Sequence, residues 1–189
     1  MSTSGKMGIP MKAATKLKIS AAAILVLIAI FLPEVVSAAW HAVHGRTVAY
    51  RQWEVKVPFE WYAISHGEGM AVERMTRLSW QNPPTAEFLP VHFSKTYPSK
   101  YFKYDVYGKA QAQALGGRGY LLQGQRDIEI AGKPGMCWIF NKYKHEEQLW
   151  IACIVPTDLT SADYIGNKAY ADEFFSFLSQ TQRNPAASK

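Results

Sequence analysis

The sequence is poor in cysteine. Cys137 and Cys153 are the only two cysteines among 189 residues, which excludes a disulfide-rich scaffold and a structural zinc site made of cysteine ligands. The two residues are far from the C-x-x-C spacing of a redox-active pair, so we do not expect thiol–disulfide exchange chemistry. One structural disulfide or two buried thiols remain as interpretations.

The usual catalytic motifs are also missing. The chain contains no G-x-S-x-G nucleophile elbow, no G-x-x-x-x-G-K-[ST] phosphate loop and no H-E-x-x-H zinc helix. Gly117-Arg118-Gly119 is glycine-rich, but it lacks the third glycine and the preceding strand of a dinucleotide-binding turn. We therefore expect a protein that is not an enzyme and that uses no cofactor and no metal.

No apolar run reaches the roughly 18 residues that normally mark a membrane-spanning helix. The longest, Ile19 to Leu32, has 14 residues without a charge; four lysines precede it and Pro33 follows it. Together with the small residues at positions 36–39, this order is typical of a signal peptide that is cut after Ala38 or Ala39.

The alternative is a retained anchor. Extension of the helix through Glu34 to about Val43 gives the roughly 20 residues that a bilayer needs and leaves the lysines in the cytoplasm. Either interpretation exports the rest of the chain across the cytoplasmic membrane. The protein is periplasmic or extracellular if the segment is cut, and a single-pass membrane protein with its C-terminal domain outside if it is not. The start codon can be that of Met1, Met7 or Met11, since the segment from Met11 is itself a complete signal peptide.

Length and charge indicate one exported domain of modest basicity. Residues 1–39 form the signal peptide or anchor, residues 40–183 suffice for one globular domain, and residues 184–189 are typical of a flexible tail. The formal net charge is +6, but four lysines and one glutamate belong to the N-terminal segment, which leaves +3 on the rest. A charge this small does not indicate nucleic-acid binding.

Two apolar stretches around the cysteines predict a β-hairpin. Residues 136–143 and 148–155 are rich in aromatic and β-branched side chains, and the polar residues 144–147 connect them. Pairing that is symmetric about His145 places Cys137 opposite Cys153, at a separation that a disulfide can bridge. In an oxidising compartment we therefore predict a Cys137–Cys153 disulfide. The same pairing sets Trp138 opposite Ala152 and Phe140 opposite Trp150.

Both faces of this hairpin are apolar, as in central strands of a sheet that is covered on both sides. Helical periodicity is present at residues 167–180 and at residues 99–116, where Ser99 can cap the helix and Phe102, Val106 and Ala110 are expected to face inward. Further strands are predicted at residues 47–50, 53–57, 59–64, within 70–80, at 88–94 and at 119–130, the last with a bend at Gly124. A loop is predicted at 81–87 and a turn at 132–135. The predicted fold class is α+β: a twisted, mainly antiparallel sheet with helices packed on its faces, preceded by one N-terminal hydrophobic helix.

A resemblance to a known family can be stated on this layout. The strand that ends in proline before a tryptophan, Trp53-Glu-Val-Lys-Val-Pro-Phe-Glu-Trp61, is followed by a mid-chain helix, long meandering strands and an aromatic C-terminal helix. This order resembles that of Mog1/PsbP-like domains over roughly residues 47–181. The resemblance implies a non-enzymatic accessory or binding role, and it transfers no binding residues.

The most suggestive surface is the lysine- and tyrosine-rich segment at residues 95–109. On a helix, Lys100, Tyr104 and Tyr107 share one side, opposite the side of Phe102 and Val106. Exposed lysine and tyrosine suit a glycan, an anionic polymer, a lipid headgroup or an envelope protein as partner. The alternative is that the tyrosines pack against the sheet and leave only their hydroxyls in water.

Two pairs in predicted hairpin tips are candidates for acid–base catalysis. His66 with Glu68, and His145 with Glu146 and Glu147, can approach within hydrogen-bonding distance, although polar residues are the ordinary content of such turns. They support the alternative of a small extracytoplasmic hydrolase. The interpretation we favour is a non-catalytic cell-envelope accessory or binding domain, soluble or tethered to the membrane through the N-terminal segment. An anchored component of a membrane assembly is a third possibility.

Overall fold

The computed structural model describes residues 11–74, 83–91 and 102–188. Within these ranges, seven antiparallel strands form the main sheet in the order β3-β4-β5-β9-β8-β7-β6. Their bounds are β3 Trp61–His66, β4 Gly69–Arg74, β5 Thr85–Pro90, β6 Tyr120–Ile130, β7 Lys133–Lys142, β8 His145–Val155 and β9 Thr160–Asn167. A smaller sheet has the order β1-β2-β10, with bounds β1 Thr47–Tyr50, β2 Trp53–Lys56 and β10 Gln182–Arg183.

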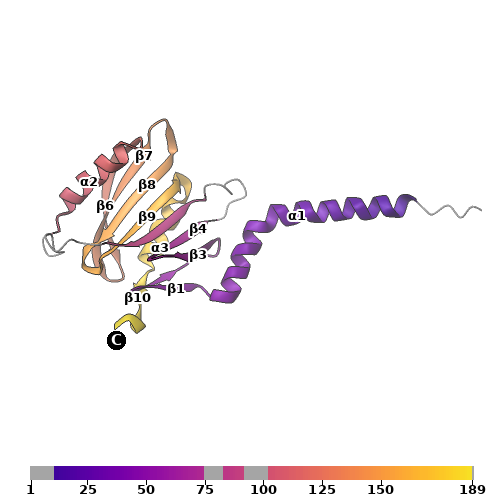
Figure 1. Cartoon of the computed structure of the whole chain (residues 1–189), viewed down its shortest axis with the longest axis horizontal. Coiled ribbons are helices and arrows are strands. Elements are labelled where there is room, and N and C mark those ends of the chain that lie inside the picture. Colours follow the sequence, from indigo (N-terminus) through magenta and orange to yellow (C-terminus); the bar gives the residue numbers. More distant parts are fainter. Residues whose placement is uncertain (1–10, 75–82, 92–101, 189) are drawn as a thin grey trace, which may run out of the picture.

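Helices cover both faces of the main sheet. The α-helices in the described part of the chain are α1 Met11–His44, α2 Tyr104–Gly116 and α3 Ala171–Ser179, and the short 3-10 helices are η2 Pro156–Asp158, η3 Lys168–Tyr170 and η4 Pro185–Ser188. Figure 1 shows α2 on one side of the sheet, α3 on the other, and α1 projecting from the domain. The α+β class and the mainly antiparallel sheet predicted from the sequence are confirmed.

The cysteine hairpin has the predicted register. Cys137 on β7 lies opposite Cys153 on β8, and the two are joined in a disulfide with a Cα–Cα distance of 4.0 Å. The predicted connection is wrong, because β8 already begins at His145 and the turn consists only of residues 143–144. A register shift between Asn141 and Lys142 absorbs the extra residues and leaves the pairing of the cysteines unchanged.

The two faces of β7 and β8 belong to two hydrophobic clusters. The cluster on the disulfide side is closed by α3 and by β1 and β2, and includes Trp53, Trp61, Phe88, Tyr164, Phe174 and Phe177. The cluster on the other side lies beneath α2 and includes Leu115, Tyr120, Trp138, Phe140, Ala152 and Ile154. Period-two alternation in strands covered on both faces accounts for this division.

Several strand boundaries differ from the prediction. β9 was missed, although it lies between β5 and β8 and joins the two halves of the main sheet. β5 begins at Thr85, inside the predicted loop, and the turn before β7 is formed by Ala131 and Gly132, both with positive φ, so that the predicted turn at 132–135 is largely strand. The predicted bend of β6 at Gly124 is confirmed by a register shift between Leu122 and Gly124.

The predicted inward face is confirmed for Phe102, which packs against the cluster beneath α2, and is wrong for Val106. Val106 is 52% exposed, whereas Tyr104, Tyr107 and Leu115 pack toward the sheet. Trp138 explains the difference, because its ring lies 6.3 Å from the ring of Tyr104 and 5.3 Å from that of Tyr107. The helix itself begins at Tyr104, and the predicted cap lies outside the described residues.

A buried ion pair attaches the small sheet to the rest of the domain. The side chain of Asp158, in η2, is 3% exposed; it accepts hydrogen bonds from the indole of Trp53 on β2 (2.6 Å) and from the guanidinium of Arg183 on β10 (2.7 Å). Both carboxylate oxygens therefore have partners, as a buried charge requires. The pair fixes β2 and β10 against the connection between β8 and β9.

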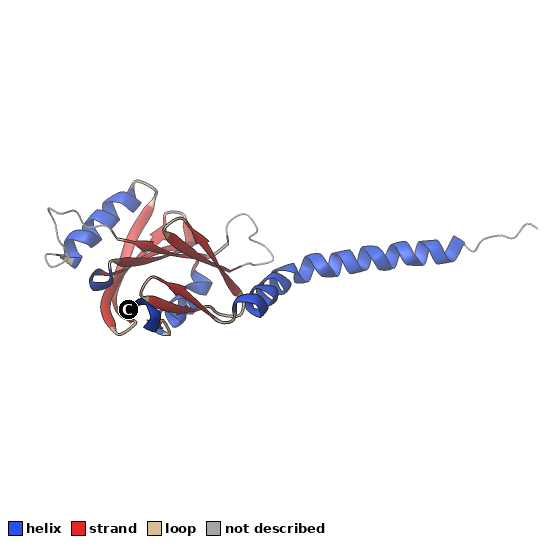
Figure 2. Cartoon of the chain, turned by 60° about the horizontal axis from the view of Figure 1, so that its bottom comes forward, coloured by secondary structure: helices blue, strands red, loops and turns tan. Residues whose placement is uncertain are grey.

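The helix α1 is continuous over 34 residues but is not straight. Figure 2 shows that it turns where it approaches the domain, and Pro33 within the helix lacks the backbone N–H of an unbroken hydrogen-bond ladder. A search of the described residues found no helix with both the length and the apolar character needed to cross a membrane.

Gly108 provides a test of how α2 packs on the sheet. A Cβ at this position would collide with the buried indole of Trp138, whereas a Cβ at Gly116, on the same helix, would meet no atom within 4 Å. We expect Gly108→Ala to lower the free energy of unfolding by about 1–3 kcal/mol through overpacking, and Gly116→Ala to leave it nearly unchanged. Urea unfolding measures both, and equal midpoints for the two variants would contradict this packing.

Candidate binding site between the N-terminal helix and the main sheet

The strand β3 is an open edge of the main sheet. Among the described strands it pairs only with β4, so every second peptide group of β3 directs its carbonyl away from the sheet. Such carbonyls require hydrogen-bond donors when they are shielded from water. In this molecule the donors come from the last turns of α1.

Two side chains of α1 reach this edge. The hydroxyl of Ser37 donates to the carbonyl of Phe59 and, at 3.3 Å, to that of Trp61. The indole of Trp40 donates to the carbonyl of Ala63 at 3.0 Å. Ser37 is 1% exposed, which is unusual for a serine on a helix that otherwise projects from the domain. The end of α1 is therefore packed as part of the domain.

His41 continues this contact toward the chain segment before β3. Its Nε2 atom lies 3.0 Å from the carbonyl oxygen of Pro58, its Nδ1 atom lies 2.8 Å from that of Gly45, and its ring stacks on Phe59 at 5.6 Å. Both carbonyls can only accept, and a neutral imidazole has a single N–H. Which of the two contacts is a hydrogen bond therefore depends on the tautomer of the ring.

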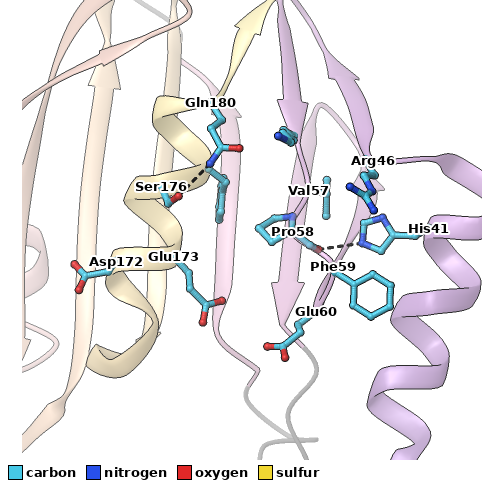
Figure 3. A pocket seen from close by; sticks show the side chains of 12 residues that line it. His41, Arg46, Val57, Pro58, Phe59, Glu60, Asp172, Glu173, Ser176 and Gln180 are labelled. Carbon is cyan, nitrogen blue, oxygen red and sulfur yellow. Dashed lines mark hydrogen bonds between the residues drawn. The ribbon is translucent and has the colours of Figure 1, made fainter.

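A pocket of about 600 Å³ lies beside this junction. Its walls come from the end of α1, from β2 and the segment that leads to β3, and from α3; the lining residues are His41, Arg46, Lys56, Val57, Pro58, Phe59, Glu60, Asp172, Glu173, Ser176, Phe177 and Gln180. Figure 3 shows the arrangement of the lining side chains. A volume of this size suits a small ligand.

The pocket has charges of both signs. Figure 3 shows Arg46 and His41 on one wall and the carboxylates of Glu60 and Glu173 together at one end. Arg74 forms an ion pair with Glu60 and lies 3.4 Å from Glu173, and the indole of Trp61 donates to Glu173 at 2.8 Å. The acidic end is thus held in place by β3 and β4, whereas Figure 3 shows Asp172 pointing away from the pocket.

The predicted catalytic candidates lie elsewhere. His66 ends β3 and Glu68 belongs to the turn before β4, while His145 and Glu146 begin β8. His145 approaches Glu147 rather than Glu146, at 3.6 Å, and both side chains are more than half exposed. None of these residues lines the described pocket. Their catalytic role stays a prediction.

The predicted binding surface is only partly described. Tyr104 and Tyr107 face Trp138, and burial raises the pKa of Tyr107 to about 12. Lys100 lies outside the described residues. Partner binding by this surface stays a prediction. Of the two placements that the sequence left open, the structure shows the second: Tyr104 and Tyr107 pack against the sheet.

The pocket residues were not among the predicted sites. Lys56, Phe59 and Glu60 belong to the stretch from Trp53 to Trp61, which indicated a strand and a layout-level family resemblance but no binding residues. The only sequence feature that pointed to this site was a charged residue, Glu60, which follows Pro58 and Phe59 after the predicted end of a strand. Long-range packing of α1 and α3 is what turns these side chains into one site.

A separate acidic pair lies on the face of the sheet that α2 covers in part. Asp163 on β9 is opposite Glu87 on β5, and its Oδ1 atom is buried without a hydrogen bond to any described residue. Burial, with a smaller effect of the neighbouring Glu87 carboxylate, raises the pKa of Asp163 to about 7. Because of this arrangement, the free energy of unfolding is expected to depend on pH.

Comparisons with known proteins identify no family. No family model and no curated protein sequence matches the chain. Among solved structures, the chain resembles cyanobacterial PsbP (CyanoP) from Synechocystis sp. PCC 6803, with 8% sequence identity and a TM-score of 0.49 over 73% of this chain and 90% of that chain. The likeness is weak, is of the same layout-level kind as the resemblance stated from the sequence, and concerns the fold alone.

The junction between α1 and β3 can be tested through Trp40. Trp40→Phe keeps an aromatic ring but removes the N–H that donates to Ala63, so we expect a loss of about 1 kcal/mol and faster amide hydrogen exchange in residues 37–44. Val43→Ala is the matched control on the same helix, because Val43 is 78% exposed. Exchange that is the same in both variants as in the wild type would show that this hydrogen bond does not hold the helix.

The buried carboxyl group predicts a pH dependence of stability. The pKa of Asp163 in the folded state, about 7, lies above its ordinary value of 3.8, so folding favours the protonated form. The stabilisation of the folded state by the protonated Asp163 is complete below about pH 4 and is lost as the pH rises through about 7. We expect Asp163→Asn to gain stability relative to the wild type between pH 5 and pH 8, by on the order of 1 kcal/mol.

Urea unfolding at the two pH values measures this difference. Glu129→Gln is the control, since Glu129 is an exposed carboxylate on the edge strand β6. A stability difference between Asp163→Asn and the wild type that does not change with pH would contradict the raised pKa of Asp163 in the folded protein.

Proposed function

We propose that this chain is a non-catalytic binding domain of the cell envelope that functions while still joined to its N-terminal helix. One observation supports this more than any other: the last turns of α1 are hydrogen-bonded to the open edge of the sheet, and Ser37 is buried there. A helix that served only as a cleavable export signal would have no need of such contacts.

Cleavage at the predicted sites would disrupt this contact. A cut after Ala38 or Ala39 removes Ser37 and leaves the carbonyls of Phe59 and Trp61 without their donor. It also places a new charged N-terminus beside Trp40, whose indole donates to the same edge. Both effects are unfavourable for a shielded strand edge, which supports retention of α1 over removal.

The surroundings of the domain are indicated by two further features. The buried Cys137–Cys153 disulfide supports an oxidising compartment outside the cytoplasm. Large apolar side chains of α1 are exposed, among them Ile24, Leu25, Val26, Leu27, Phe31 and Val35. A membrane to which α1 attaches would cover these side chains, in agreement with the lysines that precede them in the sequence.

The pocket at the junction is the binding site in this proposal. It lies where α1, the segment before β3 and α3 meet, so its shape depends on the helix being present. A hydrolase remains the alternative and requires a cavity beside His66 or His145. An envelope protein or glycan remains a candidate partner for the surface at Lys100, Tyr104 and Tyr107.

The intact mass of the native protein tests the proposal. We expect a membrane-fraction species that retains the N-terminal segment and, without reducing agent, is lighter by two hydrogens because the disulfide is formed. The measurement is mass spectrometry of soluble and membrane fractions, with a reduced sample as the control. A soluble species that begins at Ala39 or Trp40 would overturn retention of the helix.

A further inference from the structure

Two cationic residues that line the pocket beside α1 have no ion-pair partners among the described residues. Arg46, which follows α1, and Lys56, at the end of β2, are both exposed and line the pocket. Neither makes an ion pair with a described residue, in contrast to Arg74 and Arg183. A guanidinium and an ammonium group that line the same pocket favour an anionic group of a ligand.

The opposite end of the pocket favours a cation. Glu60 and Glu173 are half exposed, at 57% and 41% of their side-chain areas, and share the single guanidinium of Arg74. Two carboxylates beside one cation leave acceptor positions that face the pocket. A simple anion would be repelled from this end, and a simple cation would be repelled by Arg46 and Lys56.

The cationic end of the ligand is a hydrogen-bond donor. Carboxylates such as Glu60 accept N–H bonds from a primary ammonium, whereas a quaternary ammonium has no N–H and is usually held by several aromatic faces. Among the residues lining the pocket, only Phe59 and Phe177 are aromatic apart from His41, and Phe177 is 2% exposed. The lining therefore selects a primary amine over a choline-type group.

We propose that this pocket binds a zwitterion of the phosphoethanolamine type, with its phosphate against Arg46 and Lys56 and its ammonium against Glu60. The inference rests on the proposed function, because it gives a ligand class to the same junction pocket. The position at the base of α1, next to the 58%-exposed ring of Phe59, is suitable for the headgroup of a lipid as well as for a free molecule.

Titration calorimetry of the full-length chain in detergent tests the proposal. The probes are phosphoethanolamine, inorganic phosphate, ethanolamine and phosphocholine. We expect phosphoethanolamine to bind at least about 10-fold more tightly than each of the other three, since only it satisfies both ends of the pocket with hydrogen-bonded charge pairs.

Single substitutions separate the two ends. Arg46→Ala should weaken the binding of both phosphoethanolamine and phosphate, whereas Glu60→Gln should weaken only phosphoethanolamine, in each case by about 10-fold. Lys109→Ala and Glu129→Gln are the matched controls, exposed residues outside the pocket that remove the same kinds of charge. Unfolding midpoints of all four variants confirm that they are folded.

Two results would overturn the inference. One is equal affinity for the four probes; the other is binding of phosphoethanolamine that Arg46→Ala and Glu60→Gln leave unchanged in folded protein. The native mass tests the retention of α1 independently of ligand binding. The proposed ligand class can therefore be rejected without rejecting the proposed function.

The source of the ligand is determined by competition. In nanodiscs that contain phosphatidylethanolamine, the free compound should bind more weakly than in nanodiscs of phosphatidylcholine alone if the lipid headgroup occupies the pocket. Equal binding in the two would assign the site to a soluble phosphoethanolamine compound. Either result supports the zwitterion site.

Discussion

The unpaired edge of β3 is the constraint on which the arrangement of this molecule depends. An edge strand has carbonyls that need donors, and proteins usually protect such strands by covering them. Here Ser37 and Trp40 supply the donors from α1. Because α1 must lie along β3 to do so, its end also approaches α3, and the space between them becomes the pocket. The site is thus a consequence of how the edge is protected.

The main sheet provides the rigid support for this arrangement. Its central strands are covered on both faces, by α2 on one side and by α3 with β1 and β2 on the other. The disulfide joins β7 and β8 within the larger of these clusters, at residues that are fully buried. The ion pair of Asp158 and Arg183 then holds the small sheet, including β2, in place. The strand β2, which carries Lys56 at its end, is thereby fixed to the rest of the domain.

Local sequence patterns predicted the parts of the fold that depend on near neighbours. The register of the cysteine hairpin, the bend at Gly124 and the apolar face of α3 all follow from alternation or periodicity within one or two elements. The side of α2 that faces the sheet could not be predicted from periodicity. It is determined by packing against Trp138, on a distant strand, and by the absence of a side chain at Gly108. β9 was missed since its run of residues 160–167 mixes polar and apolar side chains on both faces. The pocket needed the docking of α1, which no local pattern contains.

The hydrogen bonds between α1 and β3 also bear on how the domain meets its surroundings. A domain on a flexible linker samples a wide range of heights and orientations above the membrane, and finds its partners by searching. Because the last turns of α1 are part of the folded domain, the helix fixes the orientation of the domain relative to itself. It also fixes the distance between the helix and the pocket. In the proposed form that retains α1, the pocket is presented in one direction relative to the helix, and the angle between α1 and the domain determines what this domain can reach.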